Sequence, residues 1–183
     1  MERHGLEVFD VSQNNINGGS FRTYIRFKGA PVGNMEGRTR VDDMRFQEKY
    51  LELDKESTYR AFGGRASLLA SSIGKFVRDE VEKGKQIIVY GASTRGNVLL
   101  QACGLDNRWL SAAAERNPDK WGKTTSGTNI PIISEEEARK AKPDYFLVLP
   151  WHFRDEFIQR EQEYLNQGGR LIFPLPEFSI VEK

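Results

Sequence analysis

Residues 87–100 read Ile-Ile-Val-Tyr-Gly-Ala-Ser-Thr-Arg-Gly-Asn-Val-Leu-Leu, and this stretch decides the fold. A short apolar run, typical of a strand buried on both faces, passes through a turn of small residues into a segment with helical character. A strand that leads through a glycine turn into a helix is the first unit of a Rossmann-like domain. We therefore predict an α/β domain of this kind over residues 85–183.

Strands and helices alternate after this first unit. The predicted strands are Gln86–Tyr90, Leu110–Ala114, Ile130–Ile133, Tyr145–Leu149 and Arg170–Phe173. The predicted helices are Asn97–Cys103, Ser134–Lys142 and Phe153–Gln167, and Ser134 with Glu137 forms a capping box. This alternation predicts a parallel sheet in the strand order 3-2-1-4-5, with helices on both faces. The connection between the second and third strands is predicted to be a loop.

Residues 1–28 are predicted to form a β-hairpin over Gly5–Phe27. In its second half, Phe21, Ile25 and Phe27 alternate with charged or polar residues, which is the period of a strand. A two-stranded hairpin is marginally stable alone in water. We therefore expect it to join a sheet supplied by the rest of the chain, by another copy or by a missing domain.

Residues 29–84 are predicted to hold a linker and two helices. In order, they are a linker over Gly29–Arg40 with Pro31, Gly33 and Gly37, a helix over Val41–Arg60 with Asp42 as its N-cap, a break at Gly63–Gly64, and an amphipathic helix that ends at Gly84.

Composition narrows the function classes. The chain has 183 residues, of which 38% are hydrophobic and 29% charged, and this suits a globular fold. A formal net charge of +1 favours neither nucleic acid nor an anionic membrane. The single cysteine, Cys103, cannot form an internal disulfide and is predicted to be a packed thiol, and no metal-type Cys/His spacing is present. With no signal core and no membrane-length apolar run, we expect a cytoplasmic setting.

The loop at residues 90–97 is the predicted binding site. Gly91 and Gly96 match the first and third glycines of a dinucleotide fingerprint, but Ser93 stands at the second position and the P-loop pattern fails. Backbone N–H groups and the dipole at a helix N-terminus attract anions. The residues expected to hold an anionic, nucleotide-like ligand are Tyr90, Gly91, Ala92, Ser93, Thr94, Arg95, Gly96 and Asn97. The alternative is a tight strand–helix turn without a ligand.

Two further segments follow predicted strand ends, where ligands of open α/β sheets bind. Glu115, Arg116 and Asn117 follow the second strand; an acidic group there binds ribose hydroxyls in Rossmann proteins, and the alternative for Glu115 is a solvated strand end. Trp151 and His152 follow the fourth strand. Trp151 offers a face on which a base or sugar can stack, and His152 can bind a phosphate or hydroxyl or transfer a proton. Simple packing is an equal alternative for both. We assign no catalytic residue, because no second catalytic group lies near His152.

In combination, these motifs resemble the C-terminal part of the S-adenosylmethionine (SAM)-dependent sugar C-methyltransferases, which act on nucleotide-linked deoxysugars. The similarity covers nearly the whole chain. The matching segments are Gly18–Arg22, Tyr90–Asn97, Glu115–Pro118 with Gly127–Ile132, and Leu149–Phe153.

The resemblance implies one part of a three-part enzyme with a small zinc-binding module, a methyltransferase domain that binds the methyl donor, and a C-terminal domain that helps to hold the nucleotide sugar. It implies that the hairpin resembles the end of the methyltransferase domain. It also places Gly91–Asn97 at the nucleotide or its phosphates, near Glu115, Arg116, Trp151 and His152. Because no such module or domain precedes Gly5, we expect this chain to bind no cofactor or metal itself. SAM is expected only through a missing domain or partner.

Three functions stay open from the sequence. The first is a nucleotide-sugar-binding C-terminal domain that does not methylate alone. The second is a stand-alone Rossmann-like domain that binds NAD or SAM, or one subunit of a split methyltransferase. The third is a structural or regulatory remnant with an empty pocket. The candidate partners are a nucleotide-linked sugar, a methyltransferase domain or subunit, and a second copy joined through the hairpin. Neither nucleic acid nor a membrane is expected.

Overall fold

The computed structural model describes residues 1–31 and 35–183, which form two compact units, Met1–Gly63 and Gly64–Lys183. Gly33 of the predicted linker lies outside the described residues. A single long helix, α2 (Glu56–Glu82), contributes its first turns to one unit and the remainder to the other.

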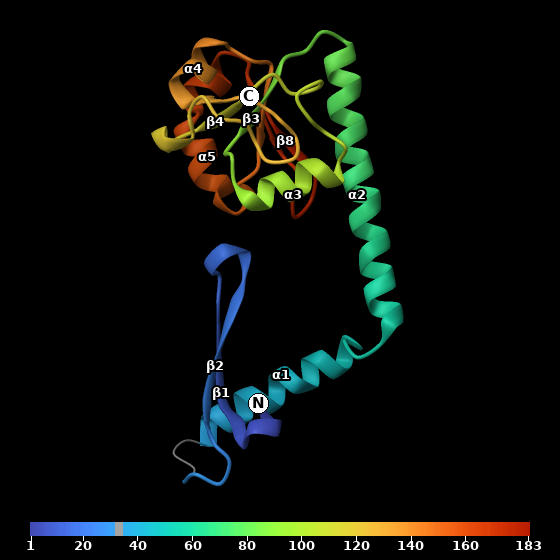
Figure 1. The fold of residues 1–183 in the computed structure, drawn as a ribbon, viewed down its shortest axis with the longest axis vertical. Helices are drawn as coiled ribbons and strands as arrows, with labels where there is room; N and C mark the ends of the chain where they lie inside the picture. The colour runs from blue at the N-terminus through green and yellow to red at the C-terminus, as the bar shows by residue number, and fades with distance from the viewer. Residues whose placement is uncertain (32–34) are drawn as a thin grey trace. The chain divides into compact units, whose positions relative to one another are not determined.

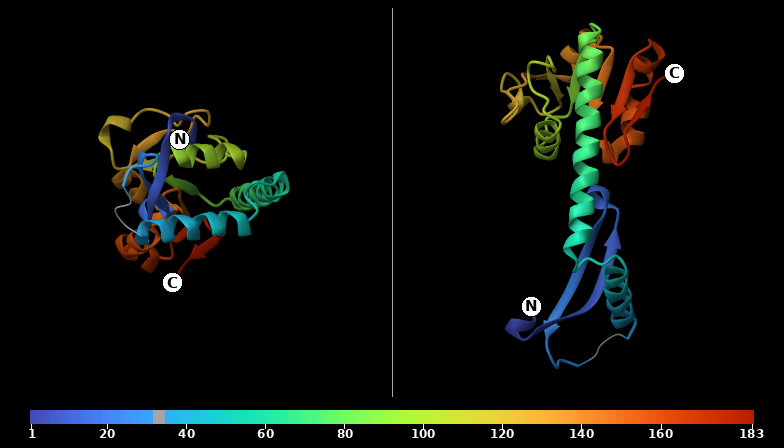
Figure 2. Two further views of the ribbon diagram at one scale, coloured as in Figure 1. Left: turned by 90° about the horizontal axis from the view of Figure 1, so that it is seen from below. Right: turned by 90° about the vertical axis from the view of Figure 1, so that its right-hand side faces the viewer.

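The first unit is built on the predicted hairpin. Strands β1 (Leu6–Asn14) and β2 (Ser20–Phe27) pair antiparallel, with a bulge between Val8 and Asp10. Short 3-10 turns, η1 (Glu2–His4) and η2 (Ile16–Gly18), flank β1, and helix α1 (Met35–Tyr50) packs on this strand (Figure 2). Gly37 makes the contact close, since a Cβ there would lie 2.9 Å from the Phe9 carbonyl oxygen. Gly37 therefore lets α1 pack closely on β1 and does not belong to a linker.

The helix boundaries in this region correct the sequence prediction. Helix α1 begins at Met35, inside the predicted linker, and Asp42 is an interior helical residue and not an N-cap. The break falls at residues 51–55, where Glu52 takes a left-handed conformation with φ 53°. The N–H of Leu53 bonds the Glu48 carbonyl and that of Glu52 bonds the Lys49 carbonyl, which is a Schellman motif. Glutamate stands where glycine is usual, so no stop signal could be recognised at this position.

The predicted break at Gly63–Gly64 was also wrong, because α2 runs through both glycines. Each glycine costs a helix interior about 0.5–1 kcal/mol relative to alanine. The helix persists because its later turns are anchored by the burial of Ala70, Ile73 and Val77. The chain leaves α2 through Gly84, with φ 83°, as predicted.

The second unit contains a six-stranded sheet in the order β5-β4-β3-β6-β7-β8. The strands are β3 (Ile87–Tyr90), β4 (Ala113–Glu115), β5 (Ile132–Ser134), β6 (Tyr145–Val148), β7 (Arg170–Phe173) and β8 (Ser179–Val181). The first five are parallel and confirm the predicted order 3-2-1-4-5. The connection from β4 to β5 is a loop, as predicted, with only the short turn η3 (Pro118–Lys120).

Smaller differences from the prediction concern the bounds of the helices and one additional strand at the edge of the sheet. Strand β8 is antiparallel to β7 and was not predicted, because three residues after a Pro-rich stretch carry too weak a pattern. Helix α3 (Thr94–Ala102) begins three residues earlier than predicted. The predicted helix Phe153–Gln167 is a 3-10 turn, η4 (Trp151–Phe153), followed by α5 (Arg154–Arg160) and α6 (Gln162–Asn166), which are separated at Glu161. Helix α4 (Glu135–Lys140) has the predicted capping box.

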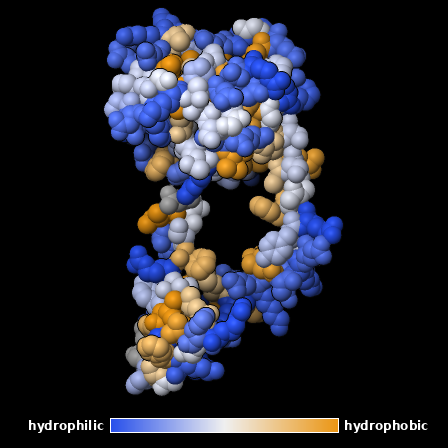
Figure 3. Space-filling view, in the orientation of Figure 1, coloured by the Kyte–Doolittle hydropathy of each residue, from blue (hydrophilic) through white to orange (hydrophobic). Residues whose placement is uncertain are grey.

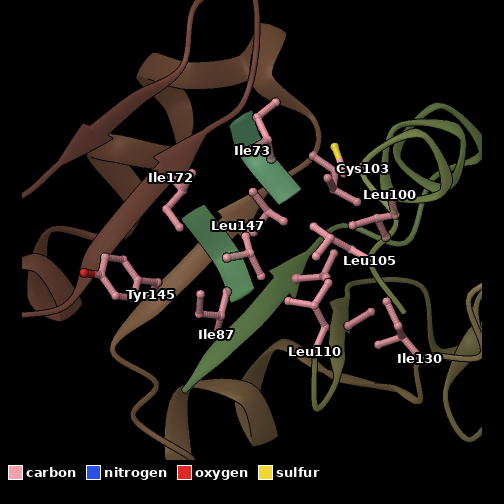
Figure 4. Close-up of a cluster of buried hydrophobic side chains, with 14 of the residues drawn as sticks. Ile73, Ile87, Leu100, Cys103, Leu105, Leu110, Ile130, Tyr145, Leu147 and Ile172 are labelled. Carbon is pink, nitrogen blue, oxygen red and sulfur yellow. The ribbon is translucent and has the colours of Figure 1, made fainter. Parts of the chain in front are cut away.

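Alternate residues of the sheet face two separate apolar clusters. Figure 1 shows the second unit, with helices α3, α4 and α5 around strands β3 and β4. On one face, Ile87, Val89 and Leu147 meet side chains from α2 and α3 (Figure 4). On the other face, Ile88, Phe146 and their neighbours meet α4, α5 and α6. The second unit is thus a three-layer α/β domain. Cys103 is buried in the first cluster, as predicted, and burial raises the pKa of its thiol to about 11. Among the described helices, none is both long and apolar enough to cross a bilayer.

Two glycines of α2 provide a matched test of this packing. A Cβ at Gly74 would overlap the Cys103 carbonyl oxygen, whereas a Cβ at Gly64 would meet nothing within 4 Å. We expect Gly74→Ala to lower the free energy of unfolding by about 1–3 kcal/mol. We expect Gly64→Ala to raise it by about 0.5–1 kcal/mol. Urea denaturation followed by circular dichroism measures both, and equal effects at the two positions would contradict the packing described.

Candidate functional site

The segments that carry the predicted site residues come together at one edge of the sheet. Strand β3 lies between β4 and β6, and all three run parallel, so their carboxyl ends share this edge. The N–H of Gly91 bonds the carbonyl of Ala114 in β4, and the N–H of Leu149, just after β6, bonds the carbonyl of Tyr90 in β3. The loop after β3, the segment after β4 and the segment after β6 are therefore neighbours, as the sequence predicted.

Gly91 and Gly96 allow two close approaches at this edge. Gly91 has φ 92°, and a Cβ on it would lie 2.7 Å from Cγ of Pro150. A Cβ on Gly96 would lie 2.5 Å from Cδ1 of Leu149. The loop thus leaves β3 tightly and helix α3 lies directly on the end of β6, which are the roles expected of the first and third glycines.

Ser93 begins helix α3. Its side chain accepts a hydrogen bond from the Gly96 N–H, and its carbonyl accepts one from the Asn97 N–H. Within the described part of the chain, no hydrogen bond is found for the N–H groups of Ser93 and Thr94. Unpaired N–H groups at a helix N-terminus form a place where an anion is stabilised. Arg95 is exposed in the same first turn.

Two buried polar atoms near this edge have no hydrogen-bond partner among the described residues. They are Oδ1 of Asn97, on the first turn of α3, and Nδ1 of His152, on the turn after β6. A buried polar atom without a partner costs about 1–3 kcal/mol, so each calls for a partner from outside the chain.

Trp151 and His152 occupy turn η4 after β6. The His152 ring lies 4.3 Å from the Phe153 ring and 6.0 Å from the Trp151 ring, measured between centroids. Trp151 is half-buried against the apolar cluster on the α4 and α5 side of the sheet. Both residues lie at the predicted edge, and part of each side chain is used in packing.

The segment after β4 places its three predicted residues differently. The carboxylate of Glu115 accepts hydrogen bonds from Ala92 and Lys120, and from the backbone of Arg116 and Asn117. The Arg116 side chain is largely exposed and lies 3.9 Å from a Glu135 oxygen. Asn117 caps the turn η3. Sequence reasoning missed Lys120, although it lies only five residues after Glu115.

Tyr90 points away from the loop that follows it. Its side chain is 1% exposed, and its hydroxyl donates a 2.7 Å hydrogen bond to Glu161. Arg139 donates 2.6 Å hydrogen bonds to both the Tyr90 hydroxyl and Glu161, and Arg160 lies 5.1 Å above the Tyr90 ring. These side chains form an ionic network under the sheet that anchors the end of β3. Glu161 and Arg139 had no sequence signal, since both lie in polar helical segments.

The two buried carboxylates at and below the edge are held ionised. Burial alone would raise the pKa of Glu161, but hydrogen bonds from Arg139 and Tyr90 outweigh it and the pKa lies below its ordinary value. Burial alone would likewise raise the pKa of Glu115, but hydrogen bonds from Asn117, Lys120 and Ala92 outweigh it, so this pKa also lies below its ordinary value. Burial, followed by the bond to Glu161, raises the pKa of the Tyr90 hydroxyl.

Two cavities lined by described residues lie away from this edge. One of about 280 Å³ lies between β1, β2 and α1, and another of about 570 Å³ lies between α4, α5 and α6. Neither of these two cavities is lined by a residue of the Gly91 loop. Among the described residues, no group of three His, Cys, Asp or Glu side chains is placed to hold a metal ion.

The family follows from comparison with known proteins. Residues 15–176 match the family model described as the C-methyltransferase C-terminal domain, and the chain belongs to this family. It is also similar to the C-methyltransferase NovU of Streptomyces niveus, with 37% identity over 180 residues. That match covers 98% of this chain but 42% of the relative, so the chain spans less than half of the relative's length.

The ionic network predicts a dependence of stability on pH. Because the pKa of Glu161 is lowered on folding, its contribution is complete above about pH 4.3, the ordinary value for glutamate, and is lost as the pH falls through the folded value. We expect Glu161→Gln to lower the free energy of unfolding by roughly 1–3 kcal/mol at pH 7. Urea denaturation at several pH values should show this difference shrinking below about pH 4.3.

Glu136→Gln is the control for this experiment. Glu136 pairs with Lys140 on the exposed side of α4, where ion pairs contribute little. Its substitution should therefore have a small effect at every pH. A Glu161→Gln difference that stays unchanged down to pH 3 would contradict an ionic role for Glu161.

Proposed function

We propose that the chain is the nucleotide-sugar-holding C-terminal domain of a SAM-dependent C-methyltransferase. The observation that carries this proposal is the edge of the sheet at the start of α3, where the N–H groups of Ser93 and Thr94 have no partner among the described residues. Such a helix start suits the diphosphate of a nucleotide sugar. The membership of the family and the relative's name support the choice of reaction.

The neighbouring side chains suit the rest of such a ligand. The hydroxyls of Ser93 and Thr94 and the guanidinium of Arg95 add polar contacts to the diphosphate. Oδ1 of Asn97 accepts, and Nδ1 of His152 accepts or donates, a hydrogen bond from a sugar or a base. In this proposal Gly91, Ala92 and Gly96 shape the loop, and the exposed part of Trp151 borders the ligand.

The methyl donor and the catalytic groups belong, in this proposal, to a methyltransferase domain in the same protein or in a partner subunit. The chain covers 42% of its relative, which leaves room for such a domain in that protein. We assign to this chain the binding of the nucleotide sugar and no chemical step.

A ligand titration tests the proposal. We expect a nucleoside diphosphate, tried as dTDP, UDP and GDP, to raise the melting temperature, whereas NAD and SAM do not. A ligand at about 100 times its dissociation constant stabilises the folded state by about 2.7 kcal/mol, which corresponds to roughly 5–10 °C. Arg95→Ala should reduce the shift.

Arg65→Ala is the matched control, because it removes the same charge from the exposed face of α2. It should leave the shift unchanged. A shift caused by NAD or SAM and by no diphosphate would replace the proposal with a cofactor site in the same loop.

We further propose that the hairpin is covered by the methyltransferase domain. One face of β2 carries Phe21, Ile25 and Phe27 at alternate positions, and these side chains are 62%, 40% and 76% exposed. Figure 3 shows hydrophobic surface on this unit. Exposed apolar patches and unpaired strand edges mark interaction surfaces, and this one fits the apolar face of an adjoining sheet.

In the absence of that domain, the same face should cause weak self-association. We expect sedimentation velocity to show a sedimentation coefficient that rises with concentration, and the double variant Phe21→Ser/Phe27→Ser to reduce the rise. Leu68→Ser is the control, because it removes an exposed apolar side chain from α2. It should leave the rise of the sedimentation coefficient unchanged. A wild-type chain that stays monomeric at all concentrations would count against an interface on this face.

A further inference from the structure

The carboxylate of Glu115 has no hydrogen-bonding capacity left for a ligand. Its Oε1 accepts from the N–H groups of Arg116 and Asn117 at 3.0 and 3.1 Å. Its Oε2 accepts from the Ala92 N–H and from Nζ of Lys120, both at 3.1 Å. A carboxylate offers about four lone-pair positions. All four are therefore used by the chain itself.

Lys120 links Glu115 to the loop after β3 through a second hydrogen bond. Its Nζ donates to the Ala92 carbonyl at 3.0 Å as well as to Glu115. Both polar groups of the Ala92 backbone are thus held, the N–H by Glu115 and the carbonyl by Lys120. The Glu115 side chain is only 14% exposed, and the Trp121 ring N–H donates to its backbone carbonyl. The pair joins the loop after β3 to the segment after β4.

Two consequences follow for ligands. In dinucleotide-binding domains, the acidic residue at the end of the second strand accepts hydrogen bonds from the ribose hydroxyls. Glu115 occupies that place, but it can bind a ribose only by giving up bonds to its own chain. The Ala92 N–H is withdrawn from phosphate binding in the same way, whereas the N–H groups of Ser93 and Thr94 at the start of α3 have no partner among the described residues.

We propose that Glu115 and Lys120 form a clamp on Ala92 that fixes the anion-binding loop and selects against ligands anchored through their ribose, such as NAD and SAM. Glu115 is then a positioning residue that acts on the ligand only through the loop. The selection against ribose-anchored ligands rests on the proposed function, whereas the clamp of Glu115 and Lys120 on Ala92 does not.

Amide exchange in the ligand-free chain tests the clamp. We expect the Ala92 amide, observed by NMR, to exchange at least about tenfold faster in Glu115→Gln than in the wild type, because a hydrogen bond to a charged group is worth about 1.5–3 kcal/mol. Asp119→Asn is the control, because it removes a carboxylate from the same segment without touching the clamp. Unchanged exchange of Ala92 in Glu115→Gln would overturn the clamp.

A pair of nucleotides tests how the site treats ribose. The affinities of UDP and 2′-deoxy-UDP are measured by calorimetry for the wild type and for Glu115→Gln. We expect the substitution to weaken both by the same factor, so that their ratio stays within about twofold. A selective loss of UDP affinity would show that Glu115 binds the 2′-hydroxyl and would overturn the inference. If neither nucleotide binds the wild type, the proposed function and the inferred selectivity are both overturned. The amide exchange of Ala92 then still tests the clamp.

Discussion

Gly91 must turn the chain away from a strand that is enclosed on every side. Strand β3 has sheet neighbours at both edges and apolar layers on both faces, and Pro150 lies against the turn that follows it. A side chain at Gly91 would displace either Pro150 or the strand. The tight turn directs α3 back over the end of β6 and so brings the start of this helix to the edge that the three parallel strand ends share. The architecture of the site therefore depends on a position without a Cβ.

The central sheet could be predicted because its signals are local. Runs such as Ile87–Tyr90 and Tyr145–Val148 are apolar throughout, which is typical of strands buried on both faces. The helix boundaries before the sheet could not be predicted, because tertiary contacts override the local signals there. Glu52 ends a helix in place of glycine, and Gly63 lies in a helix that distant packing stabilises. The edge strand β8 depends on pairing with β7 and has little pattern of its own.

The arrangement of the segments that form the candidate site was predicted, but the hydrogen bonding of their residues was not. Spacing in the sequence placed the Gly91 loop, Glu115 and His152 at one edge, since parallel strands end on the same side. Which polar groups remain available could not be predicted, because it depends on partners such as Lys120 and Glu161. Tyr90 illustrates the difference: it adjoins the loop in sequence, but strand alternation turns its hydroxyl into the network below the sheet.

Helix α2 also bears on how such domains can be exchanged between enzymes. The boundary between the two compact units falls within this continuous helix, after Gly63. A recombination point there would join the first turns of α2 from one protein to the later turns from another. The nearest interruption is the turn at residues 51–55, whose backbone is closed by its own Schellman motif. Shuffled genes that join at this turn would transfer the whole helix and the sheet it covers as one inheritable block.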